Sequence, residues 1–203
     1  MRPFAICEGI KIEYNRKSIR LKKYDYSKNG DYFITICTKN REKILSTIEI
    51  PQDTCRGRVP PLPETEYINN IPIIQTYTKI SEIIKETFNN ISKLDNVSIE
   101  DYIIMPDHIH FIAQLNNLDM KYCKNTTKGR GGTLPLHDII ARFKSFTTKQ
   151  YNEINGTIGM KLWQRNYFEH IIRNEKEYLE ILKYMQYNPL KYAIKHKLLP
   201  PLE

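Results

Sequence analysis

Residues 97–115, VSIEDYIIMPDHIHFIAQL, contain two runs of strand-forming residues separated by a short turn. Val97–Ile104 and His108–Leu115 are rich in β-branched and aromatic side chains, which favour extended backbone. Met105-Pro106-Asp107 lies between them, and proline followed by aspartate is typical of a turn. The stretch therefore predicts two consecutive strands joined by a turn.

The segments on either side of these strands complete an α+β pattern. Further strands are expected at Tyr32–Thr38 and from about Tyr167, and helices at Ile73–Ile91, at His137–Tyr151 and from an Asn174 cap to Asn188-Pro189. The resulting order, β, α, β, β, α, β, α, is that of the split βαβ, ferredoxin-like pattern. We therefore predict an α+β fold with an antiparallel sheet, helices on one face, and a C-terminal helix that carries a tyrosine.

The length of 203 residues is most simply accommodated by one domain with tails. We expect a basic N-terminal arm at 1–24, a single domain at 25–195 and a tail at 196–203. Residues 47–72 are rich in proline, and residues 116–132 are polar and contain glycine. Both segments are predicted to be irregular loops, because proline interrupts helices and strands.

The composition favours a folded protein with an excess of positive charge. The chain is 40% hydrophobic, and 31 Lys and Arg residues against 23 Asp and Glu residues give a net charge of +8. Such an excess suits a polyanionic partner such as nucleic acid, because each neutralised phosphate releases counterions. The charge alone is equally compatible with a basic protein that binds no polyanion.

The cysteines and the hydropathy pattern indicate a reducing compartment. Four cysteines lie far apart with no CxxC pair, which argues against a disulfide framework and against a zinc knuckle. No segment has a signal-peptide core or the run of about 20 apolar residues that spans a bilayer. We therefore expect a cytoplasmic protein with no membrane partner.

His108 and His110 project from the same side of their strand, because side chains alternate along a strand. Two neighbouring imidazoles can share a divalent cation if a third ligand comes from elsewhere. They can equally be strand histidines without a ligand. An isolated H-x-H motif does not decide between these interpretations.

Tyr184 and Asn188 are four residues apart and would share one face of a helix. The amide oxygen of Asn188 is a hard ligand that suits Mg²⁺ or Mn²⁺. The phenol of Tyr184 can act as a nucleophile on a phosphodiester when a cation is close. Taken alone, a tyrosine at helical spacing can also be a core residue.

The chain resembles the REP-associated tyrosine transposases and the single-tyrosine HUH insertion-sequence transposases. Four segments carry this resemblance in family order, from Ser18 to Tyr192: SIRLKKYDYSKNGDYFITICT, DYIIMPDHIHFI, GTLPLHDIIARFKSFTTK and LWQRNYFEHIIRNEKEYLEILKYMQYNPLKY. Four motifs in order are far more specific than any one of them.

The resemblance implies a metal-dependent single-stranded DNA endonuclease and strand transferase that acts on hairpin-containing DNA through a 5′-phosphotyrosine. It places the two HUH histidines at His108 and His110, the nucleophile at Tyr184 and the third metal ligand at Asn188, where the insertion-sequence branch typically has Gln. The implied cofactor is Mg²⁺ or Mn²⁺. His170 belongs to a family motif and is a possible accessory residue or a strand histidine that organises the sheet. The alternative function is a transposase-derived module that binds nucleic-acid hairpins without cutting them.

Basic side chains are expected to contact the phosphates of single-stranded or hairpin DNA. The candidates are Arg16, Arg20, Lys22, Arg142, Lys144, Arg165 and Arg173. Trp163, Tyr167 or Phe168 are candidates for stacking on bases. The resemblance is compatible with a monomer or a homodimer.

Overall fold

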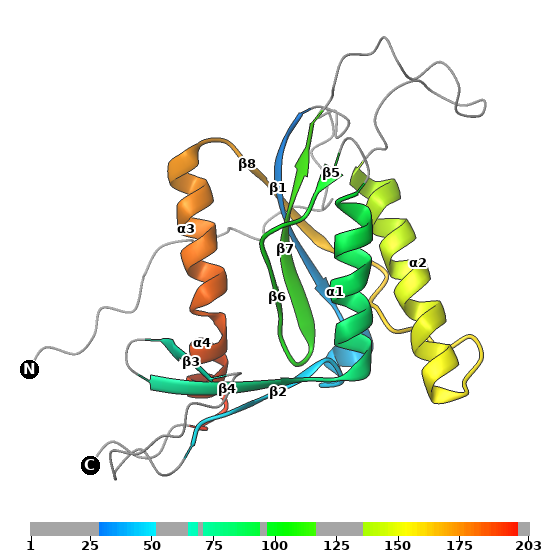
Figure 1. Cartoon of the computed structure of the whole chain (residues 1–203), viewed down its shortest axis with the longest axis horizontal. Coiled ribbons are helices and arrows are strands. Elements are labelled where there is room, and N and C mark those ends of the chain that lie inside the picture. The colour runs from blue at the N-terminus through cyan, green and yellow to red at the C-terminus, as the bar shows by residue number, and fades with distance from the viewer. Residues whose placement is uncertain (1–28, 52–64, 69–70, 94–96, 117–135, 199–203) are drawn as a thin grey trace, which may run out of the picture.

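The computed structural model describes residues 29–51, 65–68, 71–93, 97–116 and 136–198. These residues form two antiparallel sheets and four α-helices (Figure 1). The strands are β1 Gly30–Cys37, β2 Ser46–Glu49, β3 Thr65–Ile68, β4 Ile71–Tyr77, β5 Val97–Ser98, β6 Tyr102–Ile104, β7 His108–Leu115 and β8 Phe168–Ile172. The helices are α1 Lys79–Ile91, α2 Leu136–Asn155, α3 Glu175–Gln186 and α4 Asn188–Lys195, with a short 3-10 turn, η1, at Lys39–Arg41.

The larger sheet has β1 and β7 at its centre. Its strand order is β5-β7-β1-β8, and β6 also pairs with β7. All pairs are antiparallel, and the register of β1 with β7 places Thr35 opposite His110 and Cys37 opposite His108. The predicted α+β class with an antiparallel sheet is confirmed.

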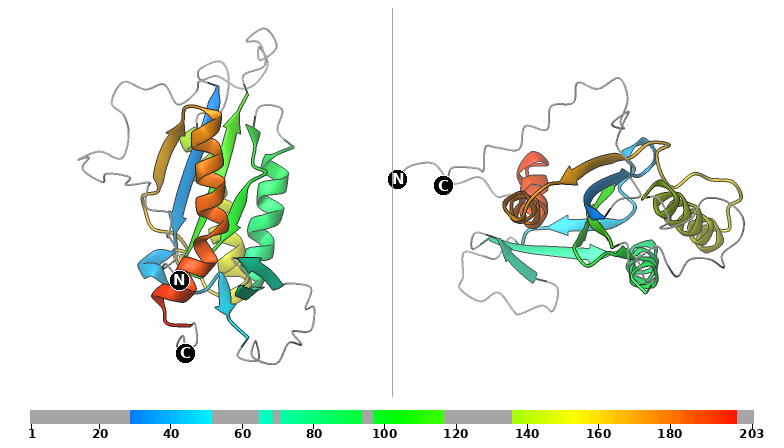
Figure 2. Two further views of the ribbon diagram at one scale, coloured as in Figure 1. Left: turned by 90° about the vertical axis from the view of Figure 1, so that its left-hand side faces the viewer. Right: turned by 90° about the horizontal axis from the view of Figure 1, so that it is seen from above.

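The two faces of the larger sheet are covered by different helices. Ile34 of β1 and Phe111 of β7 belong to the main core with residues of α1 and α2. Phe33 and Ile112, one position along each strand, form a second core with α3. Seen from above in Figure 2, α3 lies on one side of the sheet and α1 and α2 on the other. The expectation of helices on one face therefore holds for α1 and α2, whereas α3 covers the opposite face.

Residues 71–77 form a strand where a helix from Ile73 was expected. The β4 strand pairs with β2 on one side and with β3 on the other. The helix begins only at Lys79, after Thr78, whose hydroxyl donates to the carbonyl oxygens of Ile44 and Leu45. The reason is that isoleucines at this spacing fit a β-strand as well as a helix, and two strand partners decide the outcome.

The same strands change the prediction of an irregular, proline-rich loop at 47–72. Within 47–72, residues 47–49, 65–68 and 71–72 belong to strands β2, β3 and β4, so the described part of this segment contributes to a second sheet. Pro72 lies within β4. Residues 52–64 of this segment, the N-terminal arm and most of the 116–132 loop lie outside the described residues.

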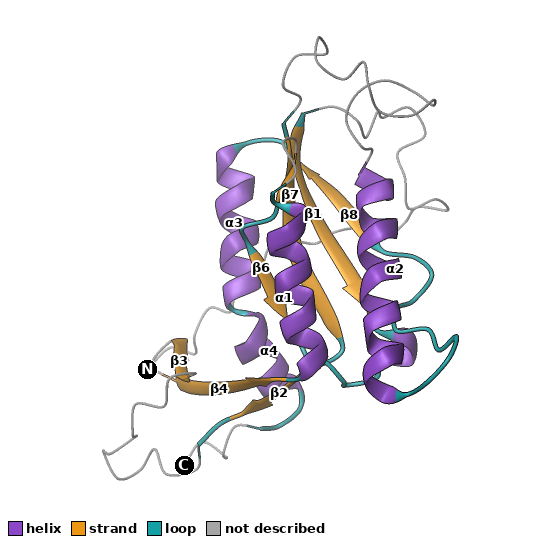
Figure 3. Ribbon diagram, turned by 45° about the vertical axis from the view of Figure 1, so that its right-hand side comes forward, coloured by secondary structure: helices purple, strands orange, loops and turns teal. Residues whose placement is uncertain are grey.

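The second sheet and α4 pack together below the larger sheet (Figure 3). Ile48 and Ile73 of this sheet share a core with Met105 and with Leu190 of α4. Asn188-Pro189 was expected to end the C-terminal helix, but the chain continues into α4, with the proline in the first turn, where its missing N–H is not needed. Within the described ranges, no helix is long and apolar enough to cross a bilayer.

Candidate functional site

The imidazoles of His108 and His110 face each other on the side of the sheet that α3 covers. Their Nε2 atoms are 3.1 Å apart. Two nitrogens that bind one divalent ion at about 2.0–2.1 Å each stand about 3 Å apart. The separation in the structure fits a shared ion, and it equally fits a hydrogen bond between the two rings.

The other nitrogen of each ring is held by a neighbouring side chain. His108 Nδ1 lies 2.6 Å from Asp107 Oδ1, and His110 Nδ1 lies 2.8 Å from Thr35 Oγ1. A carboxylate only accepts, so Nδ1 of His108 carries the proton and a neutral ring presents a lone pair at Nε2. The Thr35 hydroxyl can donate or accept, so it is compatible with either neutral tautomer of His110. Such outer contacts are typical of metal-binding histidines.

The environment of the pair favours a neutral His110 and an ionised Asp107. Burial holds the pKa of His110 well below its usual value, and the Arg41 guanidinium lowers this pKa further. Burial opposes the charge of Asp107, but the hydrogen bond to His108 and the Arg41 guanidinium outweigh it and lower the pKa of this carboxyl. Arg41 Nη1 lies 3.4 Å from Asp107 Oδ2. A neutral ring is the form in which His110 can bind metal, and the Asp107 carboxylate contacts the other ring, that of His108.

Tyr184 lies beside this pair, although 74 residues separate it from His110 in the chain. The ring centroids of Tyr184 and His110 are 5.4 Å apart in an edge-on arrangement, and Phe33 contacts both rings. Tyr184 is in the last turns of α3, and Ile181 and Met185 on either side of it anchor that helix in the second core. The position of α3 on this face therefore brings the predicted nucleophile next to the predicted metal ligands.

Asn188 is the first residue of α4, one turn after Tyr184. Its side chain is 8% exposed, and its Nδ2 is buried without a hydrogen-bond partner among the described residues. The two ends of an amide are nearly the same size, so a half-turn of the group would place the carbonyl oxygen there instead. No group of three His, Cys, Asp or Glu side chains suited to a metal occurs in those residues. A buried polar group that lacks a partner fits the role of a ligand, which stays a prediction for Asn188.

The hydrogen bond that the structure gives His170 is to α3 and not to the His108–His110 pair. Its Nε2 lies 2.7 Å from Glu177 Oε1, and Glu177 Oε2 accepts from the backbone N–H of Arg173. Asn174 caps α3 as predicted, accepting from the Glu177 backbone N–H at 2.9 Å. These contacts fix the start of α3 to β8, two turns before Tyr184.

Replacing Glu177 with glutamine is expected to lower the free energy of unfolding at pH 7 by about 1–2 kcal/mol. Partial burial raises the pKa of Glu177, but the hydrogen bonds from Arg173 and His170 outweigh it and hold the pKa below the ordinary 4.5. The unfolded chain then binds the proton more readily, so this contribution is present above pH 4.5 and is lost as the pH falls further. Denaturant unfolding of wild type and Glu177→Gln at pH 7 and near pH 3 measures it. Glu180→Gln, an exposed position on α3, is the control, and an equal deficit at both pH values would contradict the prediction.

The residues expected to contact DNA differ in their surroundings. Arg142, Arg165 and Arg173 are exposed. Lys144 is different, because its Nζ donates to the carbonyl oxygens of Gln164 at 2.6 Å and Arg165 at 3.1 Å. The structure thus gives Lys144 a part in holding the loop before β8, and its contact with phosphate stays a prediction. The three candidates in the N-terminal arm, Arg16, Arg20 and Lys22, lie outside the described residues.

Trp163 is corrected as a base-stacking residue. Its side chain is buried in the main core, and its Nε1 donates to Thr147 Oγ1 at 2.8 Å. Tyr167 and Phe168 are partly buried against the two cores. A ring enclosed by protein, such as that of Trp163, has no free face for a base.

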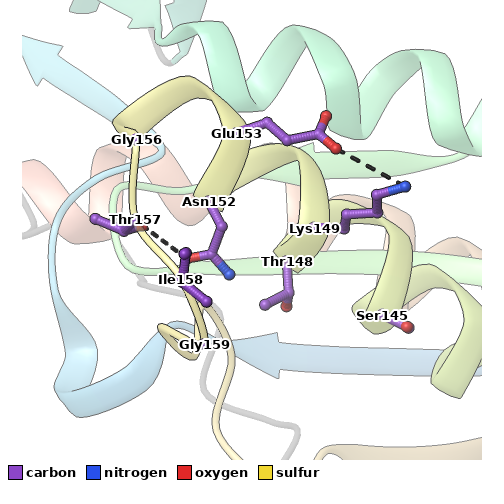
Figure 4. Close-up of a pocket in the computed structure, with 9 residues that line it drawn as sticks. All are labelled: Ser145, Thr148, Lys149, Asn152, Glu153, Gly156, Thr157, Ile158 and Gly159. Carbon is purple, nitrogen blue, oxygen red and sulfur yellow. Dashed lines mark hydrogen bonds and ion pairs between the residues drawn. The ribbon is translucent and has the colours of Figure 1, made fainter.

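A surface pocket lies away from the histidines, at the C-terminal end of α2 (Figure 4). It is lined by the last turns of α2, among them Lys149, Asn152 and Glu153, and by the turn through Ile158. Asn152 Oδ1 accepts from Thr157 Oγ1 at 2.7 Å and shapes this turn. Because α2 and α3 cover opposite faces of the sheet, the pocket is not part of the candidate site.

Three side chains at the site were not predicted from the sequence. Asp107 directly precedes the H-x-H motif, which is a local signal that an acidic partner for His108 is available. Thr35 meets His110 only through the register of β1 with β7, so no local pattern reveals it. Lys191 of α4 places its Nζ 4.8 Å from the centroid of the Tyr184 ring, and helical spacing from Tyr184 and Asn188 is the signal that points to it.

The chain is similar in sequence to known proteins. The sequence model of the family described as "Transposase IS200 like" matches residues 72–188. An uncharacterized protein of Haemophilus influenzae is 32% identical over 185 residues, which cover 87% of this chain and 89% of that one. A second protein of Haemophilus influenzae, named as a candidate REP-associated tyrosine transposase, is 27% identical over 170 residues and covers 83% and 75%.

Two solved structures are also similar to this chain. One is a REP-associated tyrosine transposase bound to a REP hairpin, with a TM-score of 0.49, 19% identity and coverage of 86% of this chain and 74% of that one. The other is a candidate transposase from Deinococcus radiodurans, with a TM-score of 0.40, 14% identity and coverage of 82% and 96%. The family match spans more than half of the chain and includes both histidines and Tyr184. This chain belongs to the IS200-like transposase family.

Proposed function

We propose that this protein is a metal-dependent nuclease and strand transferase that cuts single-stranded DNA through Tyr184. The phenol oxygen attacks a phosphodiester, forms a bond to phosphorus and displaces the 3′-oxygen. The phenol gives up its proton, and the departing 3′-oxygen takes one from solvent. A 5′-phosphotyrosine then stores the bond energy, so a 3′-hydroxyl of another strand can reverse the step without ATP.

The observation that carries the proposal is the contact between the Tyr184 ring and His110, whose ring also contacts that of His108. A phenol beside two candidate metal ligands supports nucleophilic attack on a phosphate, because a nearby cation can activate the phenol. Membership of the IS200-like transposase family supports the same chemistry. The hairpin part of the proposal rests on the motifs in the sequence and on the relative named as a REP-associated tyrosine transposase.

His108 and His110 would hold a divalent ion, with the Asn188 amide as the third protein ligand. A bound Mg²⁺ or Mn²⁺ supplies Lewis acidity, which withdraws charge from phosphoryl oxygens. The chain's own part is to orient the two Nε2 atoms through Asp107 and Thr35 and to hold the phenol beside them on α3.

The test is to incubate the protein with palindromic hairpin DNA that carries single-stranded flanks and a label on either side of the hairpin. In Mn²⁺, the strand 3′ of the cut is expected to migrate with the protein on a denaturing gel, and the other product is expected to carry a free 3′-hydroxyl. Mapping the cut identifies the attacked phosphate. Tight hairpin binding with no cleavage under any divalent ion would instead favour a binding module.

Thr35→Val is expected to weaken Mn²⁺ binding by about 10–100-fold, because outer-shell partners of metal-binding histidines commonly contribute this much. Valine keeps the shape of threonine but removes the hydroxyl that meets His110 Nδ1. Thr35→Ser keeps the hydroxyl and should bind as the wild type does. Titration calorimetry or Mn²⁺ electron paramagnetic resonance measures the affinity without DNA. Equal affinity of the valine variant and the wild type would show that Thr35 does not orient the ligand.

A further inference from the structure

Lys191 places a positive charge directly over the predicted nucleophile. Its Nζ lies 4.8 Å from the centroid of the Tyr184 ring, within the range of a cation–π contact. Lys191 is half-buried, whereas Lys195, one turn further along α4, is exposed. The ammonium group is thus held at the site by the ring and not extended into solvent.

The backbone explains how the side chain reaches this position across the end of α3. Tyr187, which separates α3 from α4, keeps right-handed helical angles of φ −81 and ψ −4. The helical phase therefore continues through the junction, and the backbone N–H of Lys191 donates to the carbonyl oxygen of Tyr187 at 3.0 Å. Positions 184, 188 and 191 share one face at this spacing. On that face the ammonium group of Lys191 contacts the Tyr184 ring.

Arg41 and Lys144, two other basic side chains of the described residues, have different partners. Arg41 pairs with Asp107, the residue that orients His108. Lys144 is engaged by backbone carbonyls in front of β8. Lys191, in contrast, contacts the Tyr184 ring itself.

We propose that Lys191 binds the phosphate that Tyr184 attacks, as a point charge on a non-bridging oxygen. The inference rests on the proposed function, since it concerns the same phosphodiester. Lys191 stays an ammonium group throughout: the bond between the phenol oxygen and phosphorus forms, the bond from phosphorus to the 3′-oxygen breaks, and Lys191 neutralises phosphoryl charge. Lysine suits this role because it is a compact charge that binds phosphate from one direction.

The experiment pairs a change in the protein with a change in the DNA. Binding of hairpin DNA is measured on a Tyr184→Phe background, so that no cleavage occurs. The DNA carries either the natural phosphate at the mapped cutting position or a neutral methylphosphonate there. Lys191→Met is expected to weaken binding of the natural DNA by about 3–10-fold and to leave binding of the methylphosphonate DNA unchanged.

Two further variants separate charge from structure. Lys191→Arg keeps the charge and should retain most of the difference in affinity between the natural and the methylphosphonate DNA. Lys149→Met removes an exposed lysine of α2, on the other side of the sheet. Its effect on binding should be the same for the natural and the methylphosphonate DNA. The slope of log Kd against log salt should fall by about 0.7 for Lys191→Met, the value for one phosphate contact on a single strand.

With Tyr184 present, Lys191→Met should slow adduct formation at saturating DNA by about 10–100-fold, a loss of about 1.4–2.7 kcal/mol of transition-state stabilisation. If the wild type forms no adduct with any divalent ion, the proposed function itself fails. If the adduct forms but Lys191→Met weakens binding of both DNAs equally, the assignment of Lys191 to this phosphate is wrong. The proposed attack by Tyr184 is then unaffected.

Discussion

Replacing Tyr184 with phenylalanine is expected to reduce covalent attachment of DNA to the protein by at least about a thousand-fold. Phenylalanine keeps the ring that packs edge-on against His110 and Phe33, so the site retains its shape and loses only the attacking oxygen. Hairpin binding should change less than about threefold, because the phenol hydroxyl is one group among many contacts. Single-turnover adduct formation on denaturing gels and a binding titration together separate the two effects.

The matched control is Tyr192→Phe on α4. Tyr192 lies near the C-terminal end of the same segment and packs against His196, with ring centroids 4.2 Å apart. Loss of its hydroxyl should leave adduct formation unchanged. Adduct formation by Tyr184→Phe at a rate near that of the wild type would show that another residue is the nucleophile.

The way α3 is attached to the sheet explains why Tyr184→Phe is expected to remove the attacking oxygen without moving the rest of the site. The second core, formed by Phe33, Ile112 and Met185 among others, attaches the last turns of α3 to the sheet. At the other end of the helix, the Tyr178 hydroxyl donates to Asp101 Oδ2 at 2.5 Å, and His170 meets Glu177. The helix is thus attached to the sheet both before and after the turn that carries Tyr184. Attachment at both ends limits how far the phenol can move from the imidazoles.

Some of this site follows from local rules and could be predicted from the sequence. His108 and His110 share a face because side chains alternate along a strand, and this depends only on the backbone of β7. The Asn174 cap and the four-residue spacing of Tyr184 and Asn188 are likewise local. These predictions needed no knowledge of the rest of the molecule.

Features that depend on distant partners were not predictable in the same way. Ile73 and Tyr77 fit a helical period and a strand equally well, and pairing of β4 with β2 and β3 decides for the strand. Both faces of the central strands carry buried apolar residues. The pattern of these strands therefore does not indicate which face α3 covers. The hydrogen bond from Lys144 to the carbonyl oxygen of Gln164 likewise depends on how the loop before β8 returns to α2. In each case a contact between distant segments decides the outcome.

Replacing His108 with alanine is expected to slow adduct formation by at least about a hundred-fold and to weaken Mn²⁺ binding in parallel. His110→Gln should have a similar effect, with glutamine chosen because His110 is buried and a small residue would leave a cavity. If the two rings act on one ion, the double variant should be no slower than either single variant, because the second loss removes nothing further. Chelation of the wild type should reproduce the defect and should not slow the double variant any more.

The control for this pair is His137→Ala, which removes an exposed histidine of α2 that contacts Asp138 at 3.2 Å. It should leave Mn²⁺ affinity and adduct formation unchanged, which excludes a general effect of losing a histidine. Additive losses in the double variant, or Mn²⁺ binding that survives in His108→Ala, would mean that the two Nε2 atoms do not share an ion. The 3.1 Å separation of these atoms would then reflect a hydrogen bond between the two imidazoles, and the charge at the attacked phosphate would have to be neutralised by protein groups such as Lys191.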